Sequence, residues 1–232
     1  MRRVFITGSS RGIGLGLVRH SLARGDRVFA SCRSPEQAFQ LNELQQEHGD
    51  RLTVLPLDVT DPAAIQSAAA TVGGLAEGLD ILYNNAGVGG GENDLGHVDG
   101  EDLVQTFRVN SVGPLLVSQA LLPLLRKGDR PVIAGITSRM GSIDDNGSGG
   151  YYAYRASKAA LNMVTTSLAV DLSTAGIIAV VLHPGWVRTD MGGKHARISV
   201  DKSVKGMLKV VDGLGKGDSG RFLAWDGEEI PW

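Results

Sequence analysis

Short apolar runs alternate with longer amphipathic stretches along the whole chain. Continuous runs rich in Val, Ile and Leu are typical of strands buried on both faces of a parallel sheet. The expected strands are Val4–Thr7, Val28–Cys32, Leu52–Leu57, Ile81–Tyr83, Val132–Thr137, Ile177–His183 and Phe222–Ala224. The expected helices are 12–24, 35–48, 61–72, 101–126, 152–174 and 200–213. This alternation predicts a doubly wound α/β fold, a seven-stranded, mostly parallel Rossmann-type sheet with helices on both faces.

Proline, glycine and helix-capping residues agree with these element boundaries. Pro35 and Pro62 lie at or near expected helix starts, where a missing N–H is tolerated, and Asp61 can cap the helix that follows it. The segment Gly141–Gly150 carries four glycines among polar residues and is expected to be a loop. No repeat and no long polar linker interrupts the pattern. We therefore expect residues 1–232 to form a single domain.

Composition removes several classes of protein. The net charge is −2 and the sequence pI is about 6.2, so no nucleic-acid partner is expected. No apolar run reaches the ~18 residues of a membrane span, and Met1–Thr7 passes into a glycine loop without a signal peptide. A cytoplasmic location follows from this pattern. The single cysteine, Cys32, can form neither an internal disulfide nor a thiolate metal cluster, and no metal site is predicted.

A glycine-rich turn joins the first expected strand to the first expected helix, over residues Thr7–Gly14. Glycines at such a junction let the backbone approach a pyrophosphate and direct the helix N-terminus at the phosphates. A tight turn alone would also require glycine, but the position after the first strand favours a dinucleotide site. The residues expected at this site are Gly8, Ser10, Arg11, Gly12, Ile13 and Gly14.

The end of the second strand bears on the choice of cofactor. No carboxylate follows Cys32 to bind a ribose 2′-hydroxyl, whereas Arg33 offers a planar fork suited to a 2′-phosphate. Arg11 could close the same pocket, although both arginines could instead be ordinary surface residues. The pattern favours NADP(H) over NAD(H). After the third strand, Asp58, next to Val59, could bind the adenine amino group or cap the following turn.

Tyr154 and Lys158 are the strongest catalytic candidates. Their four-residue spacing places them on one face of an expected helix. A tyrosine pKa near 10 is too high for acid–base work at neutral pH, and a nearby ammonium lowers it. The same spacing also recurs by chance in surface helices. Tyr151 and Tyr152 lack a lysine four residues later and are weaker candidates.

Polar residues follow two further strands, where open α/β sheets bind ligands. Ser138 follows the fifth strand, and its hydroxyl could bind a substrate oxygen or simply form a turn. Asn85, Ala86 and Gly87 follow the fourth strand, and the glycine indicates either close approach of the backbone to a ligand or a structural turn.

These motifs occur together, in one order and at consistent separations. They are Thr7–Gly14, Asn84–Gly87, Ser138, Tyr154–Lys158 and His183–Gly185. In this the chain resembles the short-chain dehydrogenase/reductase family over essentially its whole length. The run Leu182–Gly193 and the closing Trp225–Gly227 are similar to a narrower branch, which holds the Sniffer-type carbonyl reductases and the bacterial C-factor proteins.

The resemblance implies a role for each position. Tyr154 would be the proton donor in reduction and the acceptor in oxidation, while Lys158 would hold the nicotinamide ribose and lower the pKa of Tyr154. Ser138 would orient the substrate oxygen. Asn110, which the residues alone mark only as a polar group inside a helix, would keep that helix bent around a water of the proton relay. The residues expected beside the nicotinamide and its carboxamide are Pro184, Gly185, Val187 and Thr189.

The expected function is an NADPH-dependent carbonyl reductase acting on a small carbonyl or alcohol. One alternative is a dinucleotide-binding signalling or regulatory protein of C-factor type, in which catalysis is incidental. The complete set of catalytic residue types argues against a purely binding role. The other alternative is an NAD-dependent alcohol dehydrogenase, against which Arg33 argues. The resemblance also implies a homodimer or homotetramer, built on the two long helices near 101–126 and 152–174.

Overall fold

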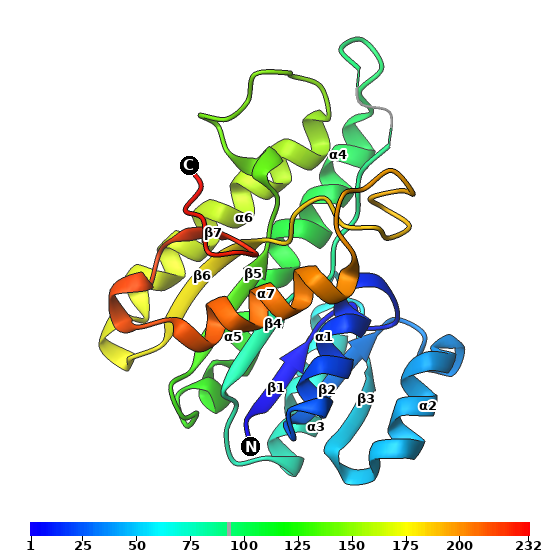
Figure 1. The fold of residues 1–232 in the computed structure, drawn as a ribbon, viewed down its shortest axis with the longest axis vertical. Helices are drawn as coiled ribbons and strands as arrows, with labels where there is room; N and C mark the ends of the chain where they lie inside the picture. Colours follow the sequence, from blue (N-terminus) through cyan, green and yellow to red (C-terminus); the bar gives the residue numbers. More distant parts are fainter. Residues whose placement is uncertain (92–93) are drawn as a thin grey trace.

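Across residues 1–91 and 94–232, which the computed structural model describes, seven strands form one sheet (Figure 1). They are β1 (Arg3–Ile6), β2 (Arg27–Cys32), β3 (Leu52–Pro56), β4 (Ile81–Asn84), β5 (Val132–Ile136), β6 (Ile178–His183) and β7 (Phe222–Ala224). Each bound lies within one residue of its prediction. The spatial order is β3-β2-β1-β4-β5-β6-β7, and every neighbouring pair is parallel. The doubly wound α/β prediction is confirmed.

Helices cover both faces of the sheet. They are α1 (Gly12–Ala23), α2 (Phe39–His48), α3 (Pro62–Leu75), α4 (Gly100–Phe107), α5 (Gly113–Leu125), α6 (Tyr152–Asp171) and α7 (Val200–Gly213). In Figure 1, α1 and α7 lie in front of the sheet and α3 and α5 lie behind it. As expected, Asp61 caps α3, its carboxylate accepting a hydrogen bond from the N–H of Ala63 at 2.8 Å.

The core is divided by the sheet into two main layers. Alternate residues of one strand enter different layers, so Val4 and Ile6 pack with α1 and α7, while Phe5 packs with α3 and α5. Phe29 on β2 is fully buried in the same layer as Phe5. A smaller cluster joins β7 and the residues after it to Leu161 of α6.

The predicted helix over 101–126 is interrupted, which is a correction to the expectation. α4 ends at Phe107, a π-helical turn spans Arg108–Val112, and α5 then begins at Gly113. Pro114 has no N–H to complete an α-helical bond to the residue four before it, which is Asn110. The π-helical turn contains Asn110, the residue whose carbonyl group lacks this partner. The expected helix over 35–48 likewise divides, into a 3₁₀ turn at Pro35–Gln37 and α2.

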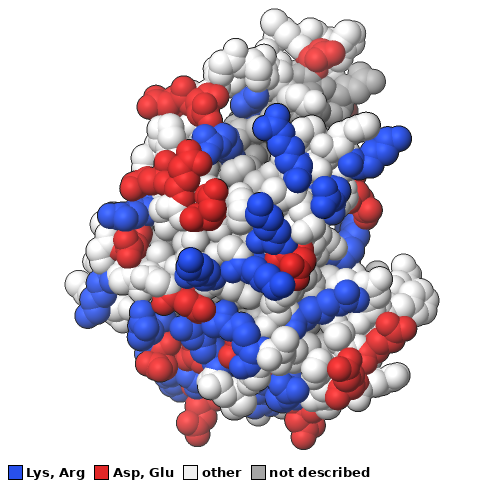
Figure 2. All heavy atoms as spheres, in the orientation of Figure 1, with Lys and Arg blue, Asp and Glu red and all other residues white. Residues whose placement is uncertain are grey.

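The loops that follow β4, β5 and β6 gather at one end of the sheet, the upper end in Figure 1. On the face drawn in Figure 2, basic and acidic side chains are intermixed, in keeping with the small net charge. Among the helices in the described parts of the chain, none is both long and apolar enough to cross a bilayer.

Candidate active site

The site lies where the strand order reverses. β1 has β2 on one side and β4 on the other, and open α/β sheets bind ligands in the crevice at the carboxyl ends of two such strands. The glycine loop follows β1, and Asn85–Gly87 follows β4. A cavity of about 1080 Å³ opens at this end of the molecule. The topology therefore brings the two motifs to one cavity.

Every residue expected to bind the cofactor lines this cavity, as do three of the four expected catalytic residues. The lining residues expected for the cofactor are Gly8, Ser10, Arg11, Gly12, Ile13, Gly14, Arg33, Asp58, Val59, Asn85, Ala86, Gly87, Tyr154, Lys158, Pro184, Gly185, Val187 and Thr189, and Ser138 joins Tyr154 and Lys158 as the third catalytic side chain. Asn110 is the exception and lies behind the cavity wall.

The glycine loop is shaped by its own backbone. Gly8 and Gly12 have φ of 65° and 57°, a region that favours glycine. A Cβ on Gly14 would overlap the carbonyl oxygen of Gly8 and lie 2.6 Å from Nδ2 of Asn85. That Asn85 nitrogen donates to the carbonyl oxygens of Thr7 at 2.9 Å and Gly8 at 3.0 Å. The loop after β4 thus holds the glycine loop in place.

The start of α1 fits a phosphate group. Its N-cap residue, Arg11, is extended, and no side chain in the described structure caps the helix. The first N–H groups of α1 are therefore available to an anion at the positive end of the helix dipole. Together with the close-approach glycines, this cradle fits the pyrophosphate of a dinucleotide.

The region beyond β2 and β3 shows one of the two roles left open for Asp58. Asp58 accepts hydrogen bonds from the backbone N–H of Thr60 at 2.8 Å and from its hydroxyl at 2.7 Å, so it caps the turn. Burial opposes the charge on Asp58, but these bonds and the nearby Arg33 outweigh it and lower its pKa. Arg33 is exposed and lines the cavity. Arg11 is paired instead with Asp190, at 2.5 Å.

Tyr154 and Lys158 lie one turn apart at the start of α6. The Lys158 Nζ is 5.7 Å from the centre of the Tyr154 ring and donates to the carbonyl oxygen of Ile136 at 2.8 Å. Burial lowers the pKa of Lys158 to about 8. Burial also raises the pKa of Tyr154, and a hydrogen bond with Ser138 offsets only part of this. The pKa of Tyr154 is therefore raised rather than lowered as expected, and the group that offsets burial is Ser138 rather than Lys158.

Ser138 reaches Tyr154 from the end of β5. It begins a short 3₁₀ turn over Arg139–Gly141, and its Oγ accepts a hydrogen bond from the N–H of Met140 at 3.2 Å. A Cβ on Gly141 would lie 2.8 Å from the Cβ of Lys158, so this turn packs directly on α6. The serine and tyrosine hydroxyls thus meet at the cavity wall from two elements.

Asn110 is completely buried in the π-helical turn. Its Oδ1 accepts from the N–H of Val88 at 2.9 Å, and its Nδ2 donates to the carbonyl oxygen of Val88 at 2.9 Å and to Oγ of Ser157 at 3.0 Å. Val88 lines the cavity, and Ser157 precedes Lys158. Asn110 therefore ties the cavity wall after β4 to α6.

The segment after β6 is fastened at its base. The N–H of Arg188 donates to the carbonyl oxygen of Ile198 at 2.9 Å, and the N–H of Ile198 donates to that of Trp186 at 3.1 Å. The hydroxyl of Thr189 accepts from the N–H of Gly192 at 3.1 Å. The segment over residues 186–198 is thus a short excursion whose base is fixed by backbone hydrogen bonds.

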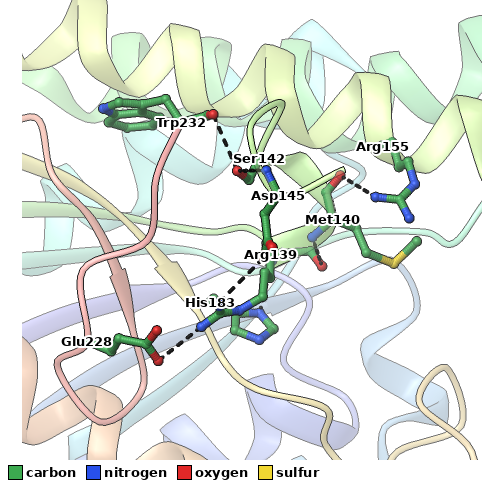
Figure 3. A network of polar contacts seen from close by, with 9 residues as sticks. Arg139, Met140, Ser142, Asp145, Arg155, His183, Glu228 and Trp232 are labelled. Carbon is green, nitrogen blue, oxygen red and sulfur yellow. Dashed lines mark hydrogen bonds and ion pairs between the residues drawn. The ribbon is translucent and has the colours of Figure 1, made fainter. Parts of the chain in front are cut away.

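Among the cavity-lining residues to which the sequence analysis gave no role are Arg139 and His183, although His183 belongs to the motif His183–Gly185. The N–H of Arg139 donates to Nδ1 of His183 at 3.2 Å (Figure 3). Burial, and secondarily the charge of Arg139, lowers the pKa of His183 to about 4, so the imidazole is neutral. The position of His183 at the carboxyl end of a strand was the signal that could have found it.

Comparisons with known proteins agree with this geometry. A family model described as short chain dehydrogenase matches residues 2–198. The chain is 53% identical over 154 residues to the C-signal of Myxococcus xanthus, covering 66% of this chain and 93% of that one. Two solved structures superpose closely. The NADPH-bound carbonyl reductase from chicken fatty liver is 43% identical with a TM-score of 0.95, covering 100% of this chain and 99% of that one. The carbonyl reductase Sniffer of D. melanogaster is 37% identical with a TM-score of 0.97, covering 100% of both chains. The chain belongs to the short-chain dehydrogenase/reductase family.

Proposed function

We propose that this protein is an NADPH-dependent carbonyl reductase in which Tyr154 donates a proton to the substrate oxygen in reduction and accepts it in oxidation. The observation that carries the proposal is the convergence of Ser138, Tyr154 and Lys158 on the cavity that the glycine loop also lines. The relatives named as carbonyl reductases superpose on the whole chain and support it.

The residues present fit NADP(H), which when bound supplies or accepts the hydride. The glycine loop and the start of α1 would hold the pyrophosphate, and Arg33 would bind the 2′-phosphate. Lys158 would hold the nicotinamide ribose through its buried ammonium. The segment Pro184–Thr189 would pack beside the nicotinamide.

The proton chemistry is supplied by the chain. Ser138 would bind the substrate oxygen, and the hydrogen-bonded Tyr154 hydroxyl would donate the proton. Burial keeps Tyr154 protonated, which suits a donor, and Lys158 would stabilise the phenolate that forms. Arg33 and the absence of a carboxylate directly after Cys32 argue against the NAD-dependent alcohol dehydrogenase.

The similarity to the C-signal of Myxococcus xanthus favours one second candidate, a dinucleotide-binding regulatory protein with incidental catalysis. Such a protein needs the glycine loop and Arg33 but has no use for a tyrosine and serine that share a hydrogen bond in the cavity. The presence of that pair is the reason we rank the reductase first.

The proposal also covers the domain organisation, location and oligomeric state of the protein. We propose a single domain over residues 1–232, a cytoplasmic location, and a homodimer or homotetramer, with a small carbonyl or alcohol as partner rather than nucleic acid or membrane. Exposed apolar side chains, Met163 and Val170 on α6 and Val104 on α4, support an interface between copies. Light scattering of the wild type beside Met163→Glu tests it, and a monomeric wild type would contradict it.

The decisive experiment follows the loss of reduced-nicotinamide absorbance with NADPH and then NADH, over quinones, diketones and aromatic aldehydes. Tyr154→Phe should reduce turnover by about 10²–10⁴-fold while NADPH still binds. The exposed neighbour Tyr152 provides the matched control, Tyr152→Phe. NADPH binding without turnover on any carbonyl would favour the regulatory protein, and a preference for NADH would contradict the role of Arg33.

A further inference from the structure

Arg139 follows Ser138 directly and is held by acidic side chains from two parts of the chain (Figure 3). Its Nη2 lies 3.0 Å from a carboxylate oxygen of Glu228, and its Nη1 lies 3.4 Å from one of Asp145. The side chain is 39% exposed and lines the cavity. Two carboxylates already neutralise the guanidinium, so it is poorly suited to capture an anionic substrate. Its ion pairs connect segments of the same chain.

The backbone of Arg139 makes a second connection. Its N–H donates to Nδ1 of His183 at 3.2 Å. His183 is the last residue of β6 and directly precedes Pro184 and Gly185, which line the cavity where the nicotinamide would lie. With Nδ1 as the acceptor, the neutral ring carries its proton on Nε2. Arg139 thus connects the turn of Ser138 to the neighbouring strand.

Glu228 belongs to a hairpin formed after β7, over residues 225–232, which we call the C-terminal hairpin. The N–H of Ala224 donates to the carbonyl oxygen of Glu228 at 2.7 Å, and the N–H of Ile230 donates to that of Phe222 at 2.8 Å. Ile230 is buried against Phe222 and Leu161 of α6. The carboxylate that holds Arg139 therefore projects from a segment with a fixed backbone.

The same hairpin contacts the loop after the Ser138 turn. The carbonyl oxygen of Trp232 accepts from the N–H of Asp144 at 2.9 Å and from Oγ of Ser142 at 3.3 Å. The Trp232 and Phe222 rings pack with centroids 5.5 Å apart. Figure 3 shows Arg139 lying between Glu228 and this loop.

We propose that Arg139 is a positioning residue: anchored by Glu228 of the C-terminal hairpin, it holds the Ser138 turn against Tyr154 and so aligns the substrate oxygen. The inference rests on the proposed function of Ser138 and Tyr154. The turn is short and spans Arg139–Gly141. The Ser138 Oγ forms hydrogen bonds with both the N–H of Met140 and the Tyr154 side chain. A small displacement of this turn would disturb both contacts.

Charge gives the pairing of Arg139 and Glu228 beside His183 a signature that can be measured without turnover. The charged groups that act on His183 are Arg139, which lowers its pKa, and Asp226 and Glu228, which raise it, while burial lowers it most. Arg139→Gln should therefore raise the pKa of His183, and Glu228→Gln should lower it further. A protonated His183 cannot accept the N–H of Arg139 at Nδ1, so the turn loosens as the ring gains its proton.

The kinetic test uses Arg139→Gln, Glu228→Gln and the double variant. The control is Arg221→Gln, which breaks a surface ion pair with Asp218 of similar length, 3.0 Å. We expect Arg139→Gln to reduce kcat/KM for the carbonyl by about 10-fold, because sub-ångström misplacement of a catalytic group has effects of this order. The KM for NADPH should stay unchanged, and the double variant should be no worse than Arg139→Gln, as for two partners of one interaction.

A nuclear magnetic resonance titration of the His183 imidazole completes the test, with the signal identified by its absence in His183→Asn. Shifts of its pKa in opposite directions in the two single variants, together with a loss in kcat/KM for the carbonyl alone, would support the inference. Shifts in the same direction, additive kinetic losses, or equal losses for NADPH and carbonyl would overturn it. If Arg139→Gln does not fold, Glu228→Gln tests the inference alone. The titration needs no turnover, so a wild type without activity would refute the proposed function and leave the charge pairing measurable.

Discussion

The two sides of the cavity are built in different ways. The cofactor side is held mostly by main chain: positive-φ glycines, the exposed start of α1, and an Asn85 side chain bonded to two carbonyl oxygens. The substrate side is held by side chains on loops, among them the partly exposed pair Arg139–Glu228. Backbone geometry is hard to vary, whereas exposed ion pairs are weak and easily exchanged. The cofactor side of the cavity is therefore the more rigid of the two, and the substrate side is the more adjustable.

The largest expected effect comes from breaking the rigid side. Gly14→Ala would place a Cβ against the Gly8 carbonyl oxygen and the Asn85 side chain. We expect NADPH binding to weaken by about 100-fold or more, since a change of ~3 kcal/mol corresponds to that factor. Fluorescence titration with NADPH measures it. The control is Gly73→Ala in α3, where a Cβ meets no atom within 4 Å. Unchanged NADPH affinity in Gly14→Ala would show that the backbone cradle is adjustable after all.

Lys158 lies where the two sides meet, and its burial should cost stability. With a folded pKa of about 8 against an ordinary value of 10.5, the native state binds fewer protons than the unfolded chain between these values. Stability therefore rises with pH across that window, and the full penalty applies below pH 8. Lys158→Met should raise the free energy of unfolding by about 1–2 kcal/mol at pH 7. The gain from removing a buried charge is partly offset, because the Ile136 carbonyl oxygen loses the hydrogen bond from Lys158.

The measurement is urea unfolding at pH 7 and near pH 10, and the gain of Lys158→Met should shrink at the higher pH. Lys127→Met, which removes an exposed lysine, is the control and should show no such pH dependence. Turnover of Lys158→Met should be lost even as the protein becomes more stable. A destabilised variant at pH 7 would contradict the assigned burial penalty.

Arg33 tests whether the cofactor side also sets the choice of cofactor. Arg33→Ser should weaken NADPH binding by about 10-fold, the effect of losing a hydrogen bond to a charged group, with no change for NADH. Binding of both cofactors by isothermal titration measures the ratio. Arg126→Ser, at the end of α5, removes the same charge far from β2 and serves as the control. An equal loss for both cofactors would assign Arg33 a general electrostatic role.

The smallest effect should come from the exposed ion pair that joins the glycine loop to the segment after β6. Asp190→Asn frees Arg11, which lines the cavity, from an ion pair whose two side chains are 76% and 74% exposed. Such pairs contribute at most about 1 kcal/mol, so NADPH should bind up to ~5-fold more tightly, while NADH is unaffected. Glu47→Gln removes another exposed carboxylate and controls for net charge. Weaker NADPH binding would mean that the pair itself holds the site closed.

The regular elements could be predicted because their signals are local. Apolar runs located the strands to within one residue, and the glycine loop and Asn85–Gly87 follow the strands that the topology places side by side. The residues alone did not predict the interruption at Arg108–Val112, because Pro114 within an apolar stretch is also compatible with an ordinary helix start; only the family resemblance implied a bend at Asn110. The cofactor residues followed from the motif and not from any contact between distant residues.

The substrate side was less predictable for a physical reason. Arg139, His183 and Glu228 are far apart in sequence, and only the fold brings them together. The balance at Tyr154 also depends on burial, which the Tyr154/Lys158 spacing does not reveal. A four-residue spacing predicts that two groups are neighbours, but it does not indicate how much water surrounds them.

The π-helical turn between α4 and α5 has a consequence for how the chain tolerates length changes. An α-helix rotates by about 100° per residue, and a π turn accommodates one extra residue. Deleting a single residue from Arg108–Val112 would therefore restore regular pitch and leave α5 in its present orientation. Deleting one residue from the regular first turn of α5 would instead rotate Val117 and Leu121, both buried against the sheet, out of the core. The apolar faces of α4 and α5 differ in phase along the sequence. The wide turn absorbs this difference, so the two helices follow one another without a loop between them.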